Sequence, residues 1–236
     1  MQRSALLFSL IVTFGSLVQI TPVNVRAWVL DSNVLTPTKL SSSAFPLASP
    51  KRADLNGDGQ DETVALVNGH LSLFSVEQVV WQSPEEWKVI QAAFTRLNAD
   101  ALPEVSLLVW RPFRPWPVDN FLPYGGRIAG FHDGKGNSCH IILIGWMNGL
   151  WTELWAGSAL ADPMTVFAAV DLNGDGRQEL ITLEGRYADS GSGPARALKV
   201  WEWNGFGFSL LASAKGTFTD LTIVRQEDGR ILILTP

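Results

Sequence analysis

The sequence predicts an all-β protein built from repeated four-stranded units, and three features of the chain support this. Short runs of β-branched and leucine residues, such as 62–67 and 179–183, have the length and composition of buried strands. The Asn-Gly pair at 68–69 supplies a turn between two such runs. A nine-residue acidic motif occurs at 54–62 and again at 171–179, which indicates an internal repeat.

The acidic motif has the spacing of a calcium-binding loop. It reads DLNGDGQDE in the first copy and DLNGDGRQE in the second, so oxygen-bearing side chains fall at positions 1, 3, 5 and 9. Calcium takes roughly six to eight oxygen ligands, and Gly at position 6 permits the sharp turn that lets them converge. We therefore expect one calcium ion in each loop. The expected ligands are Asp54, Asn56, Asp58, the Gln60 carbonyl and Glu62 in the first loop, and Asp171, Asn173, Asp175, the Arg177 carbonyl and Glu179 in the second.

Three alternative structures for the motif remain open. An EF-hand requires Glu at position 12 and a helix on each side, but position 12 is Ala65 in the first copy and Thr182 in the second, and strand-like runs follow. A dockerin needs loops that lie close together and lead into helices. The third alternative is a polar hairpin turn that holds no metal, which the identical register of the two copies disfavours.

The motif DLNGDG, followed by an acidic residue and an apolar strand, resembles the FG-GAP or VCBS repeat. The match covers the nine residues of each copy, and the rest of each repeat agrees only in its pattern. Such repeats build β-propeller blades in integrin α-subunits and in bacterial surface proteins, and these propellers are mostly interaction scaffolds. The resemblance therefore implies a propeller that binds a partner.

The N-terminal segment 1–27 is typical of a secretory signal peptide. Arg3 precedes an apolar stretch from 5 to 20, and Val25-Arg26-Ala27 offers a small-residue cleavage site before Trp28. The alternative is an uncleaved membrane anchor, although several polar residues interrupt the stretch and a span needs about 20 apolar residues. We expect a secreted, periplasmic or cell-surface protein, which contacts a membrane only if this segment is retained.

Charge and cysteine content narrow the classes of partner. The chain has 18 Lys and Arg against 23 Asp and Glu, a net charge of −5, which argues against nucleic acid because phosphates demand a basic surface. Cys139 is the only cysteine, so no intrachain disulfide can form. A protein or carbohydrate partner is compatible with both observations.

A third, altered copy of the motif lies between the two complete ones. It reads RLNADALPE at 96–104, with Asn98, Asp100 and Glu104 at positions 3, 5 and 9. Arg96 at position 1 would place a cation against a bound ion. We therefore expect no metal in this copy.

The repeat spacing predicts a β-propeller of four-stranded blades, four in number. Blades begin near residues 50, 90 and 165, and a fourth, starting at Phe218, has room for only the strands 220–225 and 231–234. N-terminal strands at 28–30 and 34–40 would complete it, which closes the ring and removes exposed sheet edges. The alternative is an open array of sheets that closes by oligomerising. With a closed ring, we expect a monomer.

One insertion, Arg111–Ser138, interrupts the domain that we assign to 28–236. A loop of this length inside a compact domain is usually functional or disordered. Its prolines restrict the backbone, and its aromatic and arginine side chains are typical of binding hot spots. The alternative is that it caps the open end of the propeller. The expected ligand-binding residues are Arg114, Trp116, Phe121 and Tyr124.

The chain shows no catalytic motif that we recognise, and we predict no catalytic residue. It contains neither a G-x-S-x-G elbow nor a P-loop, and its three histidines lack zinc spacing. We therefore expect a non-enzymatic interaction module for a protein or a glycan. The alternative is a polysaccharide-directed enzyme with its site on the insertion face. Convergent carboxylates near the insertion would favour the enzyme, whereas an aromatic and arginine patch would favour binding.

Overall fold

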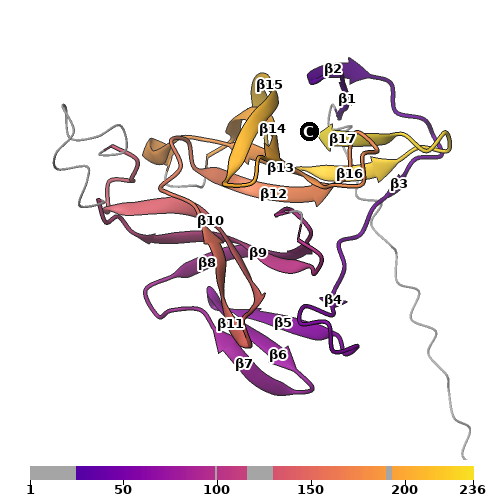
Figure 1. The fold of residues 1–236 in the computed structure, drawn as a ribbon. Coiled ribbons are helices and arrows are strands. Elements are labelled where there is room, and N and C mark those ends of the chain that lie inside the picture. Colours follow the sequence, from indigo (N-terminus) through magenta and orange to yellow (C-terminus); the bar gives the residue numbers. More distant parts are fainter. Residues whose placement is uncertain (1–24, 99, 116–129, 190–192) are drawn as a thin grey trace, which may run out of the picture.

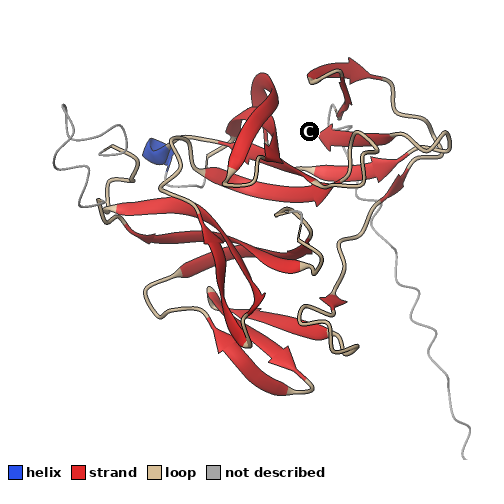
Figure 2. Cartoon of the chain, in the orientation of Figure 1, coloured by secondary structure: helices blue, strands red, loops and turns tan. Residues whose placement is uncertain are grey.

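The computed structural model describes residues 25–98, 100–115, 130–189 and 193–236. Strands make up nearly all of the regular structure, with one short 3-10 turn at Tyr187–Asp189 (Figure 2). No helix in these ranges is long and apolar enough to cross a membrane. Nearly all of the expected signal peptide, and three of the expected ligand-binding residues, lie outside the described residues. These three are Trp116, Phe121 and Tyr124.

The strands form four antiparallel sheets, which confirms the prediction of an all-β protein with four-stranded units (Figure 1). The first sheet contains β4 (Arg52–Ala53), β5 (Glu62–Val67), β6 (His70–Ser75) and β7 (Gln78–Gln82). The second contains β8 (Lys88–Thr95), β9 (Glu104–Pro112), β10 (Asn137–Met147) and β11 (Leu150–Ala156). The third contains β12 (Met164–Val170), β13 (Glu179–Glu184), β14 (Ala195–Trp203) and β15 (Phe208–Phe218). Each begins close to the predicted position.

The fourth sheet joins the two ends of the described chain. Its order is β2 (Val34–Thr38), β1 (Arg26–Asp31), β17 (Ile231–Thr235), β16 (Thr222–Arg225) and β3 (Phe45–Pro46). The predicted pairing of N-terminal with C-terminal strands is confirmed, since Ala27 lies opposite Leu234. The sheet has five strands rather than the expected four, because the two-residue strand β3, which follows β2 in the chain, pairs with β16 at the edge of the sheet. The expected end of the signal peptide at Ala27 falls inside β1.

Strand alternation explains how the second sheet is covered on both faces. Leu107 and Val109 belong to the hydrophobic cluster shared with the first sheet, whereas Leu108 between them packs in the cluster shared with the third. Successive side chains of a strand point to opposite faces, so burial of both faces requires the uninterrupted apolar runs of β9 and β10. The third sheet is likewise shared, because Leu180 packs toward the second sheet and Ile181 toward the fourth.

The inner strands of successive sheets surround a common space. A cavity of ≈ 390 Å³ is lined by residues of β8, β12 and β16 and by the segment 47–50 that leads into the first sheet. Across it, the side-chain amide of Gln91 on β8 donates to the carbonyl of Phe167 at 2.7 Å and accepts from its N–H at 3.0 Å. Gln91 thereby pairs backbone groups of β12 that no strand covers.

Successive turns of an antiparallel sheet alternate between its two ends. The acidic loops 54–62, 96–104 and 171–179 follow the first strand of their sheets and lie at one end, whereas the insertion follows β9 and leaves from the other (Figure 1). The ends of the insertion extend the ladder, because Pro112 lies opposite Asn137. The acidic loops and the described ends of the insertion thus lie at opposite ends of the sheets.

The joined fourth sheet gives the first testable prediction. Trp28 is 6% exposed, packs edge-to-face on Phe218 at 6.2 Å and donates its indole N–H to Thr235 Oγ1 at 2.9 Å. Trp28→Ala should therefore lower the free energy of unfolding by about 3–5 kcal/mol, measured by urea denaturation. Phe45→Ala, in the exposed edge strand of the same sheet, is the control and should cost on the order of 0.5 kcal/mol. Equal losses in the two variants would contradict the pairing of the chain ends.

Candidate functional site

The first acidic loop is held by hydrogen bonds from its backbone to its own side chains. Asp54 Oδ1 accepts from the N–H of Gly57 at 2.7 Å, and Oδ2 accepts from the N–H of Gly59 at 2.9 Å. Desolvation acts to raise the pKa of Asp54, but the hydrogen bonds from the N–H groups of Gly59 and Gly57 act in the opposite direction, and the pKa is lowered. Two further turns are closed where Asn56 Oδ1 and Asp58 Oδ1 accept from the N–H groups of Asp58 and Gln60, both at 2.8 Å.

The second acidic loop repeats this arrangement. Asp171 accepts from the N–H groups of Gly174 at 2.6 Å and Gly176 at 2.9 Å. Asn173 Oδ1 and Asp175 Oδ1 accept from the N–H groups of Asp175 and Arg177 at 2.9 and 2.8 Å. Gly57, Gly59, Gly174 and Gly176 all have φ between +78° and +86°, a region that side chains rarely adopt. The two motifs therefore fold into the same loop.

The glutamate at position 9 ties each loop to the core. Glu62 Oε2 accepts from the N–H of Leu55 at 2.8 Å, and Glu179 Oε2 accepts from the N–H of Leu172 at 2.7 Å. Both glutamates are buried. Desolvation raises the pKa of Glu62 and of Glu179, partly offset by those N–H groups. A positive charge in either loop would stabilise the ionised carboxylate.

The donor set of each loop fits calcium, which prefers carboxylate, amide and carbonyl oxygens. Asp54, Asp58 and Glu62 would hold the ion in the first loop together with the Asn56 oxygen and the Gln60 carbonyl. The amide and carbonyl oxygens of the motif would complete this ligand set. Asn56 Nδ2 now donates to Asp58 Oδ2 at 3.1 Å and to Glu62 Oε1 at 3.4 Å.

The altered third loop keeps the glutamate contact but not the aspartate contacts. Glu104 Oε1 accepts from the N–H of Leu97 at 2.6 Å and from Thr95 Oγ1 at 2.7 Å. Its Oε2 is buried and accepts no hydrogen bond within the described structure, and desolvation raises the pKa of Glu104. The side chain of Arg96, at position 1, is exposed.

The three acidic loops lie next to one another. The N–H of Arg96 donates to Gln178 Oε1 at 2.8 Å, which joins the third loop to the second. Gly57 of the first loop lies against Leu102 of the third, where an added Cβ would stand 3.4 Å from Leu102 Cδ2. One end of the molecule therefore carries all three loops.

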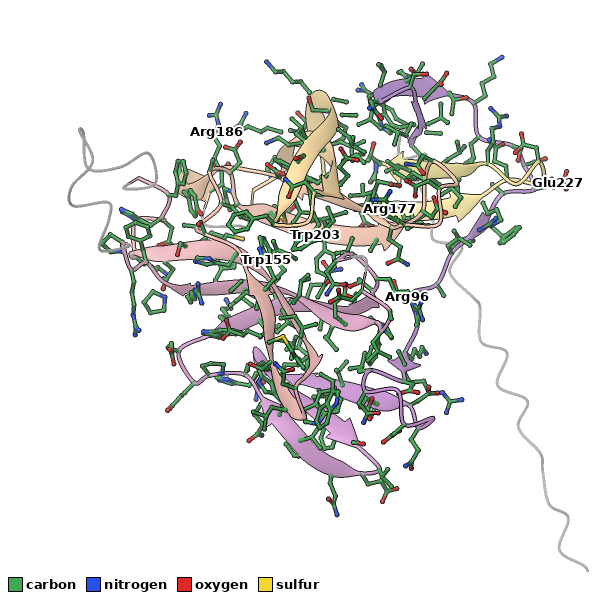
Figure 3. The ribbon with its side chains drawn as sticks, in the orientation of Figure 1. Arg96, Trp155, Arg177, Arg186, Trp203 and Glu227 are labelled. Atoms are coloured by element: carbon green, nitrogen blue, oxygen red, sulfur yellow. The ribbon has the colours of Figure 1, made fainter. Side chains whose placement is uncertain are left out.

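A groove of ≈ 720 Å³ lies beside the second and third loops. This volume is within the roughly 300–1,000 Å³ of small-molecule sites. Figure 3 shows Trp155 and Trp203 side by side at the junction of the second and third sheets, with ring centroids 5.6 Å apart. The lining residues are Asn98, Asp100, Leu154, Trp155, Arg177 and Trp203–Phe206. Sequence reasoning missed this site.

The described base of the insertion carries aromatic and arginine contacts. The Arg111 guanidinium lies over the ring of Trp87, 5.6 Å from its centroid, and Phe113 stacks at a tilt on His132 at 5.2 Å. The expected ligand residue Arg114 is exposed. Among the residues that the structure places here, Arg111 and Phe113 thus have their partners within the chain.

A serine and histidine pair on β10 escaped the sequence analysis. His140 Nδ1 lies 2.9 Å from the carbonyl of Gly157, so it carries the proton, and Ser138 Oγ donates to Nε2 at 2.8 Å. Ser138 is fully buried and His140 is 5% exposed, so the pair has no access to a substrate and serves packing. The i, i+2 spacing on one strand face was the available signal. Cys139 between them is buried, and burial raises its pKa to about 12.

A buried ion pair on the third sheet was also not predicted. Lys199 Nζ lies 2.6 Å from Glu184 Oε2, and Glu184 Oε1 accepts from Thr182 Oγ1 at 2.9 Å and from Trp201 Nε1 at 3.1 Å. Desolvation raises the pKa of Glu184, while Lys199 opposes the rise. Every oxygen of this carboxylate is paired, so the cluster is satisfied as packing.

Comparison of the sequence with protein-family models gives no match, and comparison with curated proteins gives none.

The buried histidine gives a prediction about pH. Desolvation lowers the pKa of His140 from 6.5 to about 4. Between these two pH values, His140 is therefore protonated in the unfolded chain and neutral in the folded protein. The resulting stability is present above pH 6.5 and is lost as the pH falls toward 4, by on the order of 3 kcal/mol. His140→Gln should remove this part of the pH dependence of unfolding, measured by chemical denaturation. The control His70→Gln, at an exposed position, should keep the wild-type profile, and a wild-type profile in His140→Gln would contradict the assignment.

Proposed function

We propose that this protein is an exported, calcium-binding β-propeller of four blades that acts as a non-enzymatic interaction module for a protein or a glycan. The observation that carries the calcium assignment is the repetition of one loop geometry at 54–62 and 171–179. Both complete loops also have an aspartate at position 1, where the third loop has Arg96.

Three observations support the propeller. Neighbouring sheets share hydrophobic clusters in chain order, from the first sheet to the fourth. Inner strands of three sheets line one cavity. The N-terminal strands complete the C-terminal sheet, which is a common way to seal a ring. Closure around the cavity would leave the strand edges of the blades short and outward-facing.

Export is supported by the N-terminal segment and by the calcium ions that we propose as ligands of the acidic loops. The apolar stretch between Arg3 and Arg26 has the composition of a signal peptide. Extracellular calcium modules work at about 0.1–1 mM calcium, and loops stabilised in part by their own hydrogen bonds suit such weak sites. With a closed ring the protein would be a monomer, and its negative net charge does not suit nucleic acid.

Binding rather than catalysis is supported on both faces of the molecule. Arginine and aromatic contacts mark the described base of the insertion, and the groove at the opposite end is lined by tryptophans and a few polar groups. Such surfaces concentrate binding energy in a few side chains. An array of glycans and proteins, probed with the chain in calcium and in EDTA, tests whether it binds a partner at all.

Calcium binding is tested by calorimetry. The wild-type chain should bind two calcium ions, and calcium should raise the melting temperature because it binds only the folded loops. Asp58→Ala removes a ligand of the first loop and should leave one site. Asp61→Ala is the matched control, since Asp61 lies in the same loop, pairs with Arg52 at 3.1 Å and is not an expected ligand. Three sites, or none at millimolar calcium, would contradict the assignment.

A further inference from the structure

The turn between β14 and β15 holds an aromatic side chain in solvent on a fixed backbone. Phe206 is 88% exposed, yet its N–H donates to Asn204 Oδ1 at 3.0 Å and its carbonyl accepts from Trp155 Nε1 at 2.8 Å. Gly205 has φ +94°, which glycine adopts readily. Phe206 therefore stands at the groove on a turn with little backbone entropy left to lose on binding.

The aromatic side of the groove is a packed cluster rather than a set of loose rings. Trp155, Trp203 and Phe208 meet edge-to-face, with centroid separations of 5.6, 5.3 and 5.3 Å. Trp155 and Trp203 are half-buried and line the groove. Rings held in this way offer flat apolar surface in a defined orientation.

The polar side of the groove carries a carboxylate and a guanidinium, beside the side-chain amides of Asn98 and Asn204. Asp100 Oδ2 accepts from Asn98 Nδ2 at 2.7 Å, and its second oxygen accepts no hydrogen bond from the described residues. The Arg177 side chain is 67% exposed, and its nearest carboxylate, Asp175, lies 4.0 Å away. The two charges are opposite, so the groove offers strong hydrogen bonds without favouring a charged ligand.

We propose that this groove binds a neutral oligosaccharide, with sugar rings against Trp155, Trp203 and Phe206 and hydroxyl groups bonded to Asp100 and Arg177. A pyranose ring has apolar C–H faces and a rim of hydroxyl donors and acceptors, which matches aromatic walls beside a carboxylate and a guanidinium. The inference rests on the proposed function as an interaction module, and it names the ligand class and the face. That face carries the acidic loops and is not the insertion face.

A peptide fits the same groove less well. β11 is an edge strand of its sheet, and peptides commonly pair with such edges. Leu154 and Trp155, which line the groove, pack with the hydrophobic cluster between the second and third sheets. They therefore project from a face of β11, and the groove lies over that face rather than along the edge where an added strand would pair. A charged ligand would be attracted by one of the two side chains, Asp100 and Arg177, and repelled by the other.

The test is titration of the purified chain with cellohexaose, maltohexaose, laminarihexaose and chitohexaose, followed by calorimetry and by tryptophan fluorescence. Hexagalacturonic acid and a peptide library are the charged and peptide probes. At least one neutral hexasaccharide should bind, and Phe206→Ala and Asp100→Asn should each weaken it about tenfold or more. Both positions are exposed, so these variants should fold.

Matched controls remove the same residue types elsewhere. Phe45→Ala and Asp31→Asn, also at exposed positions, should leave the affinity unchanged. The inference is overturned if no neutral hexasaccharide binds at millimolar concentration, or if the groove variants bind as the wild type does. An acidic glycan or a peptide whose binding is weakened by Phe206→Ala, with no neutral hexasaccharide bound, would also overturn it, while the interaction module itself would stand. Groove-dependent sugar binding without any calcium site would overturn the calcium assignment and leave this inference intact.

Discussion

A buried glutamate that accepts a hydrogen bond from its own loop fixes each acidic turn to the core. The glutamate is the first residue of the strand that follows the turn, and its partner is the N–H of the leucine at position 2. The pairs are Glu62 with Leu55, Glu104 with Leu97 and Glu179 with Leu172, at 2.8, 2.6 and 2.7 Å. The same leucine inserts its side chain into a hydrophobic cluster. Loss of such a buried acceptor leaves an unpaired N–H, which costs about 1–3 kcal/mol.

The third loop shows that this contact and a metal site are separate requirements. It keeps the Glu104 contact although Arg96 replaces the aspartate at position 1 and Ala101 replaces the glycine at position 6. The hydrogen bonds from positions 4 and 6 to an aspartate occur only in the two complete loops. The frame of a four-stranded sheet therefore needs the glutamate, and the aspartate and glycine residues serve the loop interior, where we place calcium.

The repeat made much of the fold predictable, because each four-stranded sheet has a local sequence signal. The acidic loop marks the first turn, and alternating burial marks the strands, so the starts of the sheets were located and the pairing of the chain ends followed from the missing strands. β3 could not be predicted, since Phe45–Pro46 is only two residues long and pairs solely with β16. The ends of the insertion were also missed as strand, because Pro112 lacks the N–H that usually marks a ladder residue.

The groove was beyond sequence reasoning for a different physical reason. Its walls come from four segments far apart in the chain, around Asp100, Trp155, Arg177 and Trp203, and they meet only because neighbouring sheets pack with their first and third turns at the same end. A sequence pattern within one strand cannot indicate which distant segments of the chain lie together in the folded protein. Trp155 shows the difficulty, because it packs on Phe208 and also lines the groove.

The two ends of the sheets offer different kinds of surface. At the acidic end, short turns are fixed by side-chain to backbone hydrogen bonds, such as those from Phe206 and Gly207 to Asn204 Oδ1, so little ordering is required when a small ligand binds. At the opposite end, the long connection between β9 and β10 interrupts the repeat, and the described contacts there join Arg111 to Trp87. Because the groove and the described base of the insertion share no residue and lie at opposite ends of the sheets, the proposed module would present a small-ligand site and a second surface without either constraining the other.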